Sequence, residues 1–395
     1  MKYNFDEVIN RRGTGSIAYD GQYKVYDYDN LEPFWVADMD IKTPDFIIEN
    51  LKKKLDQSHF GYVVWKQDEY LSAIKQWYKR RFSVNVQKND IYYVPSILFT
   101  VTEMIREFSK EGEGVLIHTP AYNAFLNLIE GNKRVAVESP LIATEDGYHL
   151  DREQFEKVAS RSDVKVFILC NPHNPTGKVW TKEECEFMRD VCEKNDVFIV
   201  SDEIHMDFVR SEQGFFSMTN LMKLDSPILV VTGLGKTFNL ASLASSFMIT
   251  KHRFTTLQFN RKLSAYYGLA AANTLAVEAV KVAYTQSEEW VDQLNQHIEK
   301  NMTILKSFID NEMSDQLSFI KPESTYLAWI DFSKSGYSEK EVQNALQSVG
   351  KIATGLGHSY ELGDSHHFRL NVACSEEKLL KGLQSIKQSF DALNK

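Results

Sequence analysis

Short runs of apolar residues alternate with amphipathic stretches through the middle of the chain. In the amphipathic stretches the apolar positions recur every three or four residues, which indicates helices. One such stretch, Thr181 to Asn195, begins with Thr181 and Glu184 at the spacing of a capping box. The apolar runs between the helices are Val115–His118, Val164–Leu169, Val197–Val200 and Ile228–Val231. Strands that alternate with helices predict a large, doubly wound, mostly parallel α/β sheet.

The two ends of the chain have a different pattern. Apolar residues at helical spacing are found at 45–57, 67–82, 98–110 and 274–312. The last of these ranges predicts one or two long helices. It is followed by predicted strands at Thr325–Asp331 and Phe368–Val372 and by an amphipathic helix from Glu376 to Leu393. This α+β pattern in the C-terminal third predicts a second, smaller domain.

The length of the chain agrees with two domains. A chain of 395 residues is long enough for two or three domains at roughly 150 residues each. We expect the large α/β domain to span residues 46–285. We expect the small α+β domain to combine residues 1–45 with 286–395, because the N-terminal segment has no apolar run suited to the core of a sheet.

Composition and charge narrow the possible functions. The chain is 43% apolar and 25% charged, and its 45 Lys and Arg against 54 Asp and Glu give a net charge of −9. This charge argues against a general nucleic-acid or anionic-membrane binder. The sequence has no signal core and no apolar stretch near the ~18 residues of a membrane span. Its few cysteines form no CxxC pair, which is typical of reduced thiols. We therefore expect a cytoplasmic protein without nucleic-acid or membrane partners.

Polar, aromatic or glycine-rich segments follow all four central apolar runs. These segments are Thr119-Pro-Ala-Tyr122, Cys170–Gly177, Ser201–His205 and Thr232–Lys236. In open parallel sheets, ligands bind beyond the carboxyl ends of the strands. Because four successive strands end in such segments, we expect the segments to form one binding site at the same edge of the sheet.

Lys236 and Asp202 are the most informative residues of these segments. Each follows a predicted buried strand, and the two strands are consecutive. A lysine amine and a carboxylate at one sheet edge suit pyridoxal phosphate (PLP). The aldehyde of PLP condenses with a lysine amine, and its ring nitrogen must stay protonated to withdraw electrons. The pair therefore predicts a PLP site.

A nucleotide site is a rival interpretation of the lysine segment. Gly235-Lys236-Thr237 resembles the end of a P-loop, but that motif needs a glycine five residues before Gly235. Position 230 is Val, and the glycine at 233 leaves no room for a loop around a triphosphate. The sequence therefore argues against a nucleotide site.

A metal site is a rival interpretation of the aspartate segment. Asp202, Glu203, His205 and Asp207 all carry side chains that bind metals. Adjacent residues on a strand point to opposite faces, so Asp202 and Glu203 would not share an ion. No metal is expected.

The chain resembles fold-type I PLP enzymes of the class I/II aminotransferase superfamily, with an aspartate-aminotransferase-like fold. Within it, the chain is most similar to the MalY/PatB-like branch of C–S lyases (cystathionine β-lyases). The resemblance extends over essentially the whole chain and is carried by Arg11-Arg-Gly-Thr14, Trp35-Val-Ala-Asp-Met-Asp40, Phe60-Gly-Tyr62, Thr119-Pro-Ala-Tyr122, Asn171-Pro-His-Asn-Pro-Thr-Gly177, Ser201-Asp-Glu-Ile-His-Met-Asp207, Lys236-Thr-Phe-Asn239, Ser324-Thr-Tyr-Leu-Ala-Trp329 and Arg369-Leu-Asn371.

The resemblance implies roles for five residues around the cofactor ring. Lys236 would hold PLP covalently and, once substrate displaces it, act as the general base at Cα. Asp202 would keep the ring nitrogen protonated. Asn174 would donate a hydrogen bond to the ring oxygen, with His205 in a secondary role nearby. Tyr122 would stack on the ring and belong, with Lys236, to the catalytic residues.

The resemblance also implies how the phosphate is bound, although two positions depart from the family pattern. The family binds the phosphate on backbone amides at the start of a helix, aided by hydroxyl groups. The candidate contacts here are Ser96, Ile97, Leu98 and Thr232. The family often has a serine where Gly233 stands and an arginine where Ala244 stands. Tyr62 would reach the phosphate across the interface of a homodimer with shared active sites.

Substrate binding and the reaction follow from the same resemblance. The fork-shaped guanidinium of Arg369 suits the α-carboxylate of a small amino-acid substrate. Asn174 and the backbone at Ala37 would contact the substrate as well. The implied reaction is β-elimination of an S-substituted cysteine, which gives pyruvate, ammonia and a thiol. An aminotransferase on the same scaffold, and a PLP-binding regulatory partner of a transcription factor, remain alternatives.

Overall fold

The computed structural model describes residues 3–269, 271–363 and 365–394. Within these ranges, eight strands form one sheet in the order β2-β9-β8-β7-β6-β3-β4-β5. The predicted strands are neighbours in its centre: β3 (Gly114–Thr119), β6 (Val164–Cys170), β7 (Phe198–Asp202) and β8 (Ile228–Gly233). They pair in parallel, so the predicted mostly parallel α/β sheet is confirmed.

Further strands extend the sheet on both sides. On one side, β4 (Val135–Thr144) pairs in parallel with β3, and β5 (Gly147–Leu150) pairs antiparallel with β4. On the other side, β9 (Ser246–Thr250) and β2 (Ile91–Val94) are both antiparallel to their neighbours. The apolar pattern does not predict these strands, since β2 is short and β4 exposes much of its second half.

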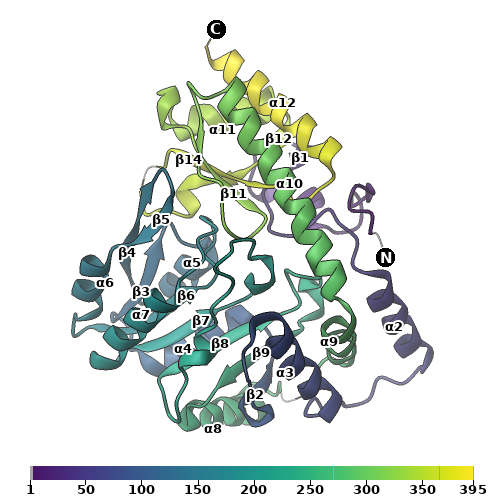
Figure 1. Cartoon of the computed structure of the whole chain (residues 1–395), viewed down its shortest axis with the longest axis vertical. Helices are drawn as coiled ribbons and strands as arrows, with labels where there is room; N and C mark the ends of the chain where they lie inside the picture. Colours follow the sequence, from purple (N-terminus) through teal and green to yellow (C-terminus); the bar gives the residue numbers. More distant parts are fainter. Residues whose placement is uncertain (1–2, 270, 364, 395) are drawn as a thin grey trace.

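Helices cover both faces of the eight-stranded sheet (Figure 1). In β6, Val166 packs in the core that includes α4 (Ile97–Phe108), whereas its neighbour Phe167 packs in the core that includes α7 (Lys182–Lys194). A strand that is buried on both faces has no polar side, which explains why these runs are almost entirely apolar. The predicted capping box of α7 is confirmed, with both of its hydrogen bonds present at Thr181.

The other predicted helices agree with the structure to within about two residues, which is the usual uncertainty of helix ends. The range 274–312 forms two helices that meet at Ser287. The helices not yet given are α1 (Ile17–Asp20), α2 (Asp45–Asp56), α3 (Asp68–Phe82), α5 (Asn123–Gly131), α6 (Arg152–Ala159), α8 (Arg253–Arg261), α9 (Thr274–Gln286), α10 (Glu288–Glu312), α11 (Glu339–Ser348) and α12 (Glu376–Leu393).

A second, antiparallel sheet belongs to the C-terminal third, in the order β10-β11-β14-β13. Its strands are β10 (Ser318–Phe319), β11 (Leu327–Asp331), β13 (Gly355–Leu356) and β14 (His367–Asn371). In Figure 1 this sheet and helices α11 and α12 lie at one end of the molecule. The N-terminal strand β1 (Glu32–Pro33) pairs with β12 (Ile352–Ala353) in the same region. The domain limits at 45/46 and 285/286 stay a prediction. No helix in the described ranges is long and apolar enough to cross a membrane.

Candidate active site

A cavity of about 230 Å³ lies where the central strands end. Four parts of the chain form its wall: the start of α4, the residue before α5, the end of β7 with the residues after it, and the segment from the end of β8 to the start of β9. It brings together most of the residues predicted to contact the cofactor. The residues that line it are Ser96, Ile97, Leu98, Tyr122, Asp202, Ile204, Gly235, Lys236, Leu240, Ala241, Ser245 and Ser246. The strand ends therefore meet at one site, as the sequence predicts.

The Lys236 amine is buried in this cavity. Its Nζ donates a hydrogen bond of 2.7 Å to the carbonyl oxygen of Ala37. Burial and the positive charge of Arg369 lower the pKa of Lys236 to about 8, while the negative charges of Asp38 and Asp202 oppose this change. A larger fraction of the amine is therefore unprotonated near neutral pH than in an ordinary lysine, as a nucleophile or base requires.

Asp202 is the last residue of β7 and is almost completely buried. Burial raises the pKa of its carboxyl to about 7, although a hydrogen bond of 3.1 Å from the Ile204 amide and the charge of Lys236 favour ionisation. The pKa shows that the site does not fully compensate the carboxylate charge. A bound cation would stabilise this carboxylate.

The start of α4 faces the same cavity. Ser96 is the N-cap of this helix, and its hydroxyl accepts a hydrogen bond of 3.1 Å from the Phe99 amide. The amides of Ile97 and Leu98, in the first turn, have no acceptor within the helix. Free amides and the helix dipole attract anions at such a position. This end of the cavity therefore suits a phosphate.

Arg369 and Asn174 also come together, although neither lines this cavity. Arg369 lies on β14 and is buried. One of its Nη atoms donates to Oδ1 of Asn174 at 3.2 Å, and the other donates to the carbonyl of Trp35 at 2.6 Å. The guanidinium also lies over the ring of Tyr360, 4.8 Å from its centre. These contacts fix the plane of the guanidinium.

The segment from Trp35 to Asp40 links this arginine to Lys236. Its carbonyl at Trp35 accepts from Arg369, and its carbonyl at Ala37 accepts from Lys236. Tyr326 donates its hydroxyl to the same Ala37 carbonyl at 2.9 Å. The segment has no regular hydrogen-bond ladder here, so side chains from distant parts of the chain satisfy its backbone.

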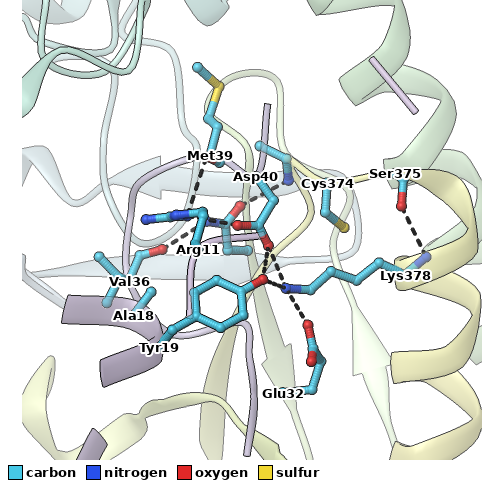
Figure 2. Close-up of polar contacts among 12 residues, drawn as sticks. Arg11, Ala18, Tyr19, Glu32, Val36, Met39, Asp40, Cys374, Ser375 and Lys378 are labelled. Atoms are coloured by element: carbon cyan, nitrogen blue, oxygen red, sulfur yellow. Dashed lines mark hydrogen bonds and ion pairs between the residues drawn. The ribbon is translucent and has the colours of Figure 1, made fainter. Parts of the chain in front are cut away.

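Charged side chains form a cluster around Asp40 of this segment (Figure 2). Arg11 binds the carboxylates of Asp38 and Asp40 at 2.5 and 2.7 Å. Lys378 forms ion pairs with Asp40 and, at 2.8 Å, with Glu32. These side chains are mostly buried, except for Glu32. The charge cluster, defined as these five residues, joins the N-terminal segment to α12.

Three further residues that were predicted to bind the cofactor are not part of the cavity wall: Thr232, Tyr62 and His205. The hydroxyl of Thr232 donates to the Glu203 carbonyl at 3.1 Å, and Thr232 is not among the residues that line the cavity. The role of Thr232 as a phosphate contact stays a prediction. Tyr62 is 99% exposed, between α2 and α3. His205 is buried, and its Nδ1 has no hydrogen-bond partner among the described residues. Burial, followed by the charges of Lys236 and Arg369, lowers the pKa of His205 well below its usual range.

The sequence analysis missed several residues of the cavity wall. Ser245 and Ser246 belong to it because β9 returns antiparallel to β8, which pairs Ser246 with Gly233. The only sequence signal was two adjacent hydroxyl residues before a short apolar run. Tyr326 and Asn371 were part of the motifs, but no role followed from their positions. Asn371 donates to the carbonyls of Val36 and Asp38 at 2.7 and 2.5 Å.

A buried lysine, an aspartate on the preceding strand and a free helix N-terminus at one edge of a doubly wound sheet define a PLP enzyme of fold type I. Residues 35–386 match the family described as aminotransferase class I and II. The chain is 35% identical to protein MalY of Escherichia coli over 391 residues, 99% of this chain and 100% of that protein.

Two further comparisons agree with this match. The chain is 34% identical to the cystathionine beta-lyase PatB of Bacillus subtilis over 98% of this chain and 100% of PatB. The structure of cystalysin from Treponema denticola, which contains pyridoxal 5′-phosphate, superposes with a TM-score of 0.93 over 100% of both chains at 29% identity. The chain therefore belongs to the class I and II aminotransferase family.

Proposed function

We propose that the protein is a PLP-dependent carbon–sulfur lyase. Its substrates would be S-substituted cysteines such as cystathionine, and its products pyruvate, ammonia and a thiol. The observation that carries the proposal is the buried Lys236 amine, which shares a cavity with Asp202 and is linked through the Ala37 segment to Arg369. The likeness to MalY and PatB over nearly the whole chain favours the lyase reaction.

The residues of the cavity fit PLP. Asp202 has a raised pKa because nothing in its buried surroundings fully balances its charge; a protonated ring nitrogen would do so. His205 Nδ1 has no hydrogen-bond partner among the described residues, and the ring lies near the positive charges of Lys236 and Arg369. The amides of Ile97 and Leu98 would hold the phosphate. When bound, the cofactor supplies an electron sink for the pair released at the substrate Cα.

The side chains of this chain perform the remaining tasks. Arg369 would bind the substrate α-carboxylate, since Asn174 and the Trp35 carbonyl already orient its guanidinium. Lys236 would remove the Cα proton, because its lowered pKa leaves an unprotonated amine available. The bond between Cβ and sulfur then breaks, and the thiolate takes up a proton. Water converts the three-carbon product into pyruvate and ammonia.

A substrate test distinguishes this reaction from transamination on the same scaffold. Cystathionine supplied without any keto acid should give pyruvate, ammonia and homocysteine over many turnovers. An aminotransferase would instead stop after one turnover and resume only when a keto acid is added. That stall, without release of thiol, would replace the lyase by an aminotransferase.

We also propose a homodimer in which Tyr62 of one copy completes the phosphate site of the other. The support is the exposure of Tyr62 together with its apolar neighbours Phe60 and Val64, which are 57% and 70% exposed. Tyr62→Phe should weaken PLP retention several-fold, as for the loss of one hydrogen bond, and leave the dimer intact. A fully active, PLP-saturated monomer in sedimentation would contradict the proposal.

Two coarser proposals concern the chain as a whole. We infer that it works in the cytoplasm, which agrees with four free, buried cysteines. We also infer that residues 46–285 form one domain and that 1–45 with 286–395 form the other. Limited proteolysis should cut first near the two domain limits, and a first cut inside α4–α7 would contradict the domain division. Fractionation of the source cells should place the protein in the cytoplasm, and recovery elsewhere would contradict the localisation.

A further inference from the structure

The hydroxyl of Ser245 is a buried polar group without a partner in the wall of the cavity. Ser245 is only 4% exposed, and its Oγ has no hydrogen bond to any described residue. A buried hydroxyl without a partner costs stability, so proteins rarely retain one unless a ligand or water completes it. Ser245 lies in the same wall as Lys236, Ile97 and Leu98. Its position therefore points to a ligand group in the cavity.

Gly233 makes room for this position of Ser245. A Cβ atom on Gly233 would lie 2.5 Å from the carbonyl oxygen of Ser245 and 3.0 Å from Cα of Ser246. Both distances are too short for a stable contact, and the atoms concerned are backbone atoms that cannot turn away. A side chain at 233 and the present position of Ser245 therefore exclude one another. The geometry thus excludes a hydroxyl side chain at position 233 of β8, whereas Ser245, directly before β9, carries one.

Two of the hydroxyl groups predicted to contact the phosphate, those of Ser96 and Thr232, are already engaged. Ser96 Oγ accepts from the Phe99 amide as the N-cap, and Thr232 Oγ1 donates to the Glu203 carbonyl. The first amides of α4 attract an anion but need a neighbouring donor to hold it in one orientation. Ser245 is a hydroxyl of the cavity wall that is free to donate.

We propose that Ser245 donates its hydroxyl to the phosphate of PLP and so takes the place of a side chain that Gly233 excludes. The inference rests on the proposed function, because it assigns the phosphate end of the same cofactor site. The partners of the phosphate are then the Ser245 hydroxyl and the first amides of α4. Pyridoxal, which is PLP without its phosphate, makes the remaining contacts of the ring but not these.

The test compares the binding of PLP and pyridoxal to the full chain. Each compound is titrated into the cofactor-free protein, and its dissociation constant is measured from the absorbance change. Ser245→Ala should weaken PLP binding about tenfold to a hundredfold, as for a hydrogen bond to a charged group. It should leave pyridoxal binding unchanged. Inorganic phosphate should compete with PLP less well in the variant than in the wild type.

A matched control removes a nearby hydroxyl that the cavity does not contain. Ser242 is exposed and lies outside the cavity wall, so Ser242→Ala should leave both constants unchanged. If Ser245→Ala fails to fold, Ser245→Cys keeps a small side chain with a weaker donor and carries the same comparison. An equal loss for PLP and pyridoxal, or no loss for either, would overturn the assignment of Ser245. A wild-type protein that binds neither compound would instead overturn the proposed function.

Discussion

The two sides of the active site are built in different ways. On one side, Lys236 and Asp202 follow central strands whose backbone positions are fixed by hydrogen bonds to neighbouring strands on both sides. On the other side, the segment from Trp35 to Asp40 is irregular, and side chains hold its backbone. The cofactor is therefore expected to depend on the strand side and the substrate on the segment side.

This difference has a physical consequence. A ladder of backbone hydrogen bonds joins main-chain groups, so the backbone on the strand side does not depend on any single polar side chain as a partner. The segment side relies on a few long-range pairs, such as Arg11 with Asp38. Loss of one such partner leaves the others buried without compensation. Each prediction below either breaks one of the two sides or measures its contribution.

The largest effect is expected on the strand side, for Lys236→Ala. Without the amine, general base catalysis at the substrate Cα is lost, so kcat should fall by at least about a thousandfold. Borohydride should no longer fix PLP to the chain. The control is Lys182→Ala, which removes an exposed lysine of α7 and should change neither property. A tryptic map with the label on another lysine would disprove the role of Lys236.

The second prediction concerns the pH dependence of stability in the cofactor-free protein. The folded state keeps a proton on Asp202 up to about pH 7, whereas an ordinary aspartate loses it near pH 3.8. The folded state thus binds more protons between these values, and the stability that this provides is lost as the pH rises through the range. The loss is at most ~4 kcal/mol.

Denaturant unfolding of the wild type and of Asp202→Asn measures this contribution. Glu203 and Asp207 also have raised pKa values because of burial, so only the difference between the two proteins reports on Asp202. The stability of the wild type relative to Asp202→Asn should decrease from about pH 4 to about pH 7. This change with pH should become smaller when PLP is bound. Parallel curves for the two proteins would show that Asp202 titrates normally.

The third prediction breaks the segment side at Arg369. Arg369→Ala should raise KM for every amino-acid substrate roughly tenfold to a hundredfold, since a charge-assisted contact of ~1.5–3 kcal/mol is lost. PLP should stay bound. Because the charge of Arg369 lowers the pKa of Lys236, the rate of PLP capture should require a higher pH in this variant. Arg369→Lys keeps the positive charge but loses the fork-shaped guanidinium. Compared with Arg369→Ala, it should therefore restore the pH dependence of PLP capture more than it restores KM.

The smallest of the four effects is expected for Arg11, in the charge cluster. Arg11→Met removes both ion pairs that flank Met39 and should lower the free energy of unfolding by about 1–3 kcal/mol. KM should increase several-fold while PLP affinity stays the same. The matched control is Arg12→Met, because the Arg12 guanidinium contacts the Leu31 carbonyl, the exposed Glu32 and the Tyr19 ring but forms no ion pair with Asp38 or Asp40 among the described residues. Equal loss of PLP and substrate binding would show that the two sides are not independent.

Much of the strand side could be predicted from local sequence. Ile228–Val231 is apolar at every position and Val164–Leu169 at every position but Lys165, because both faces of these strands are buried. Parallel strands end at the same edge, so Lys236 and Asp202 could be placed together before any distance was known. The same argument does not show the direction of the Thr232 side chain, because sequence does not reveal that its hydroxyl turns towards the Glu203 carbonyl.

The contacts that hold the segment from Trp35 to Asp40 could be seen only in the tertiary structure. Ala37 is 199 residues from Lys236, and Asp40 is 338 residues from Lys378. No local pattern specifies such pairs, since they form only when the N-terminal segment packs against both the end of β8 and α12. Ser245 is a similar case: it reaches the cavity because β9 runs antiparallel to β8 beside Gly233. The sequence thus determined which chemical groups the strands present, whereas packing between distant segments decided which groups surround them.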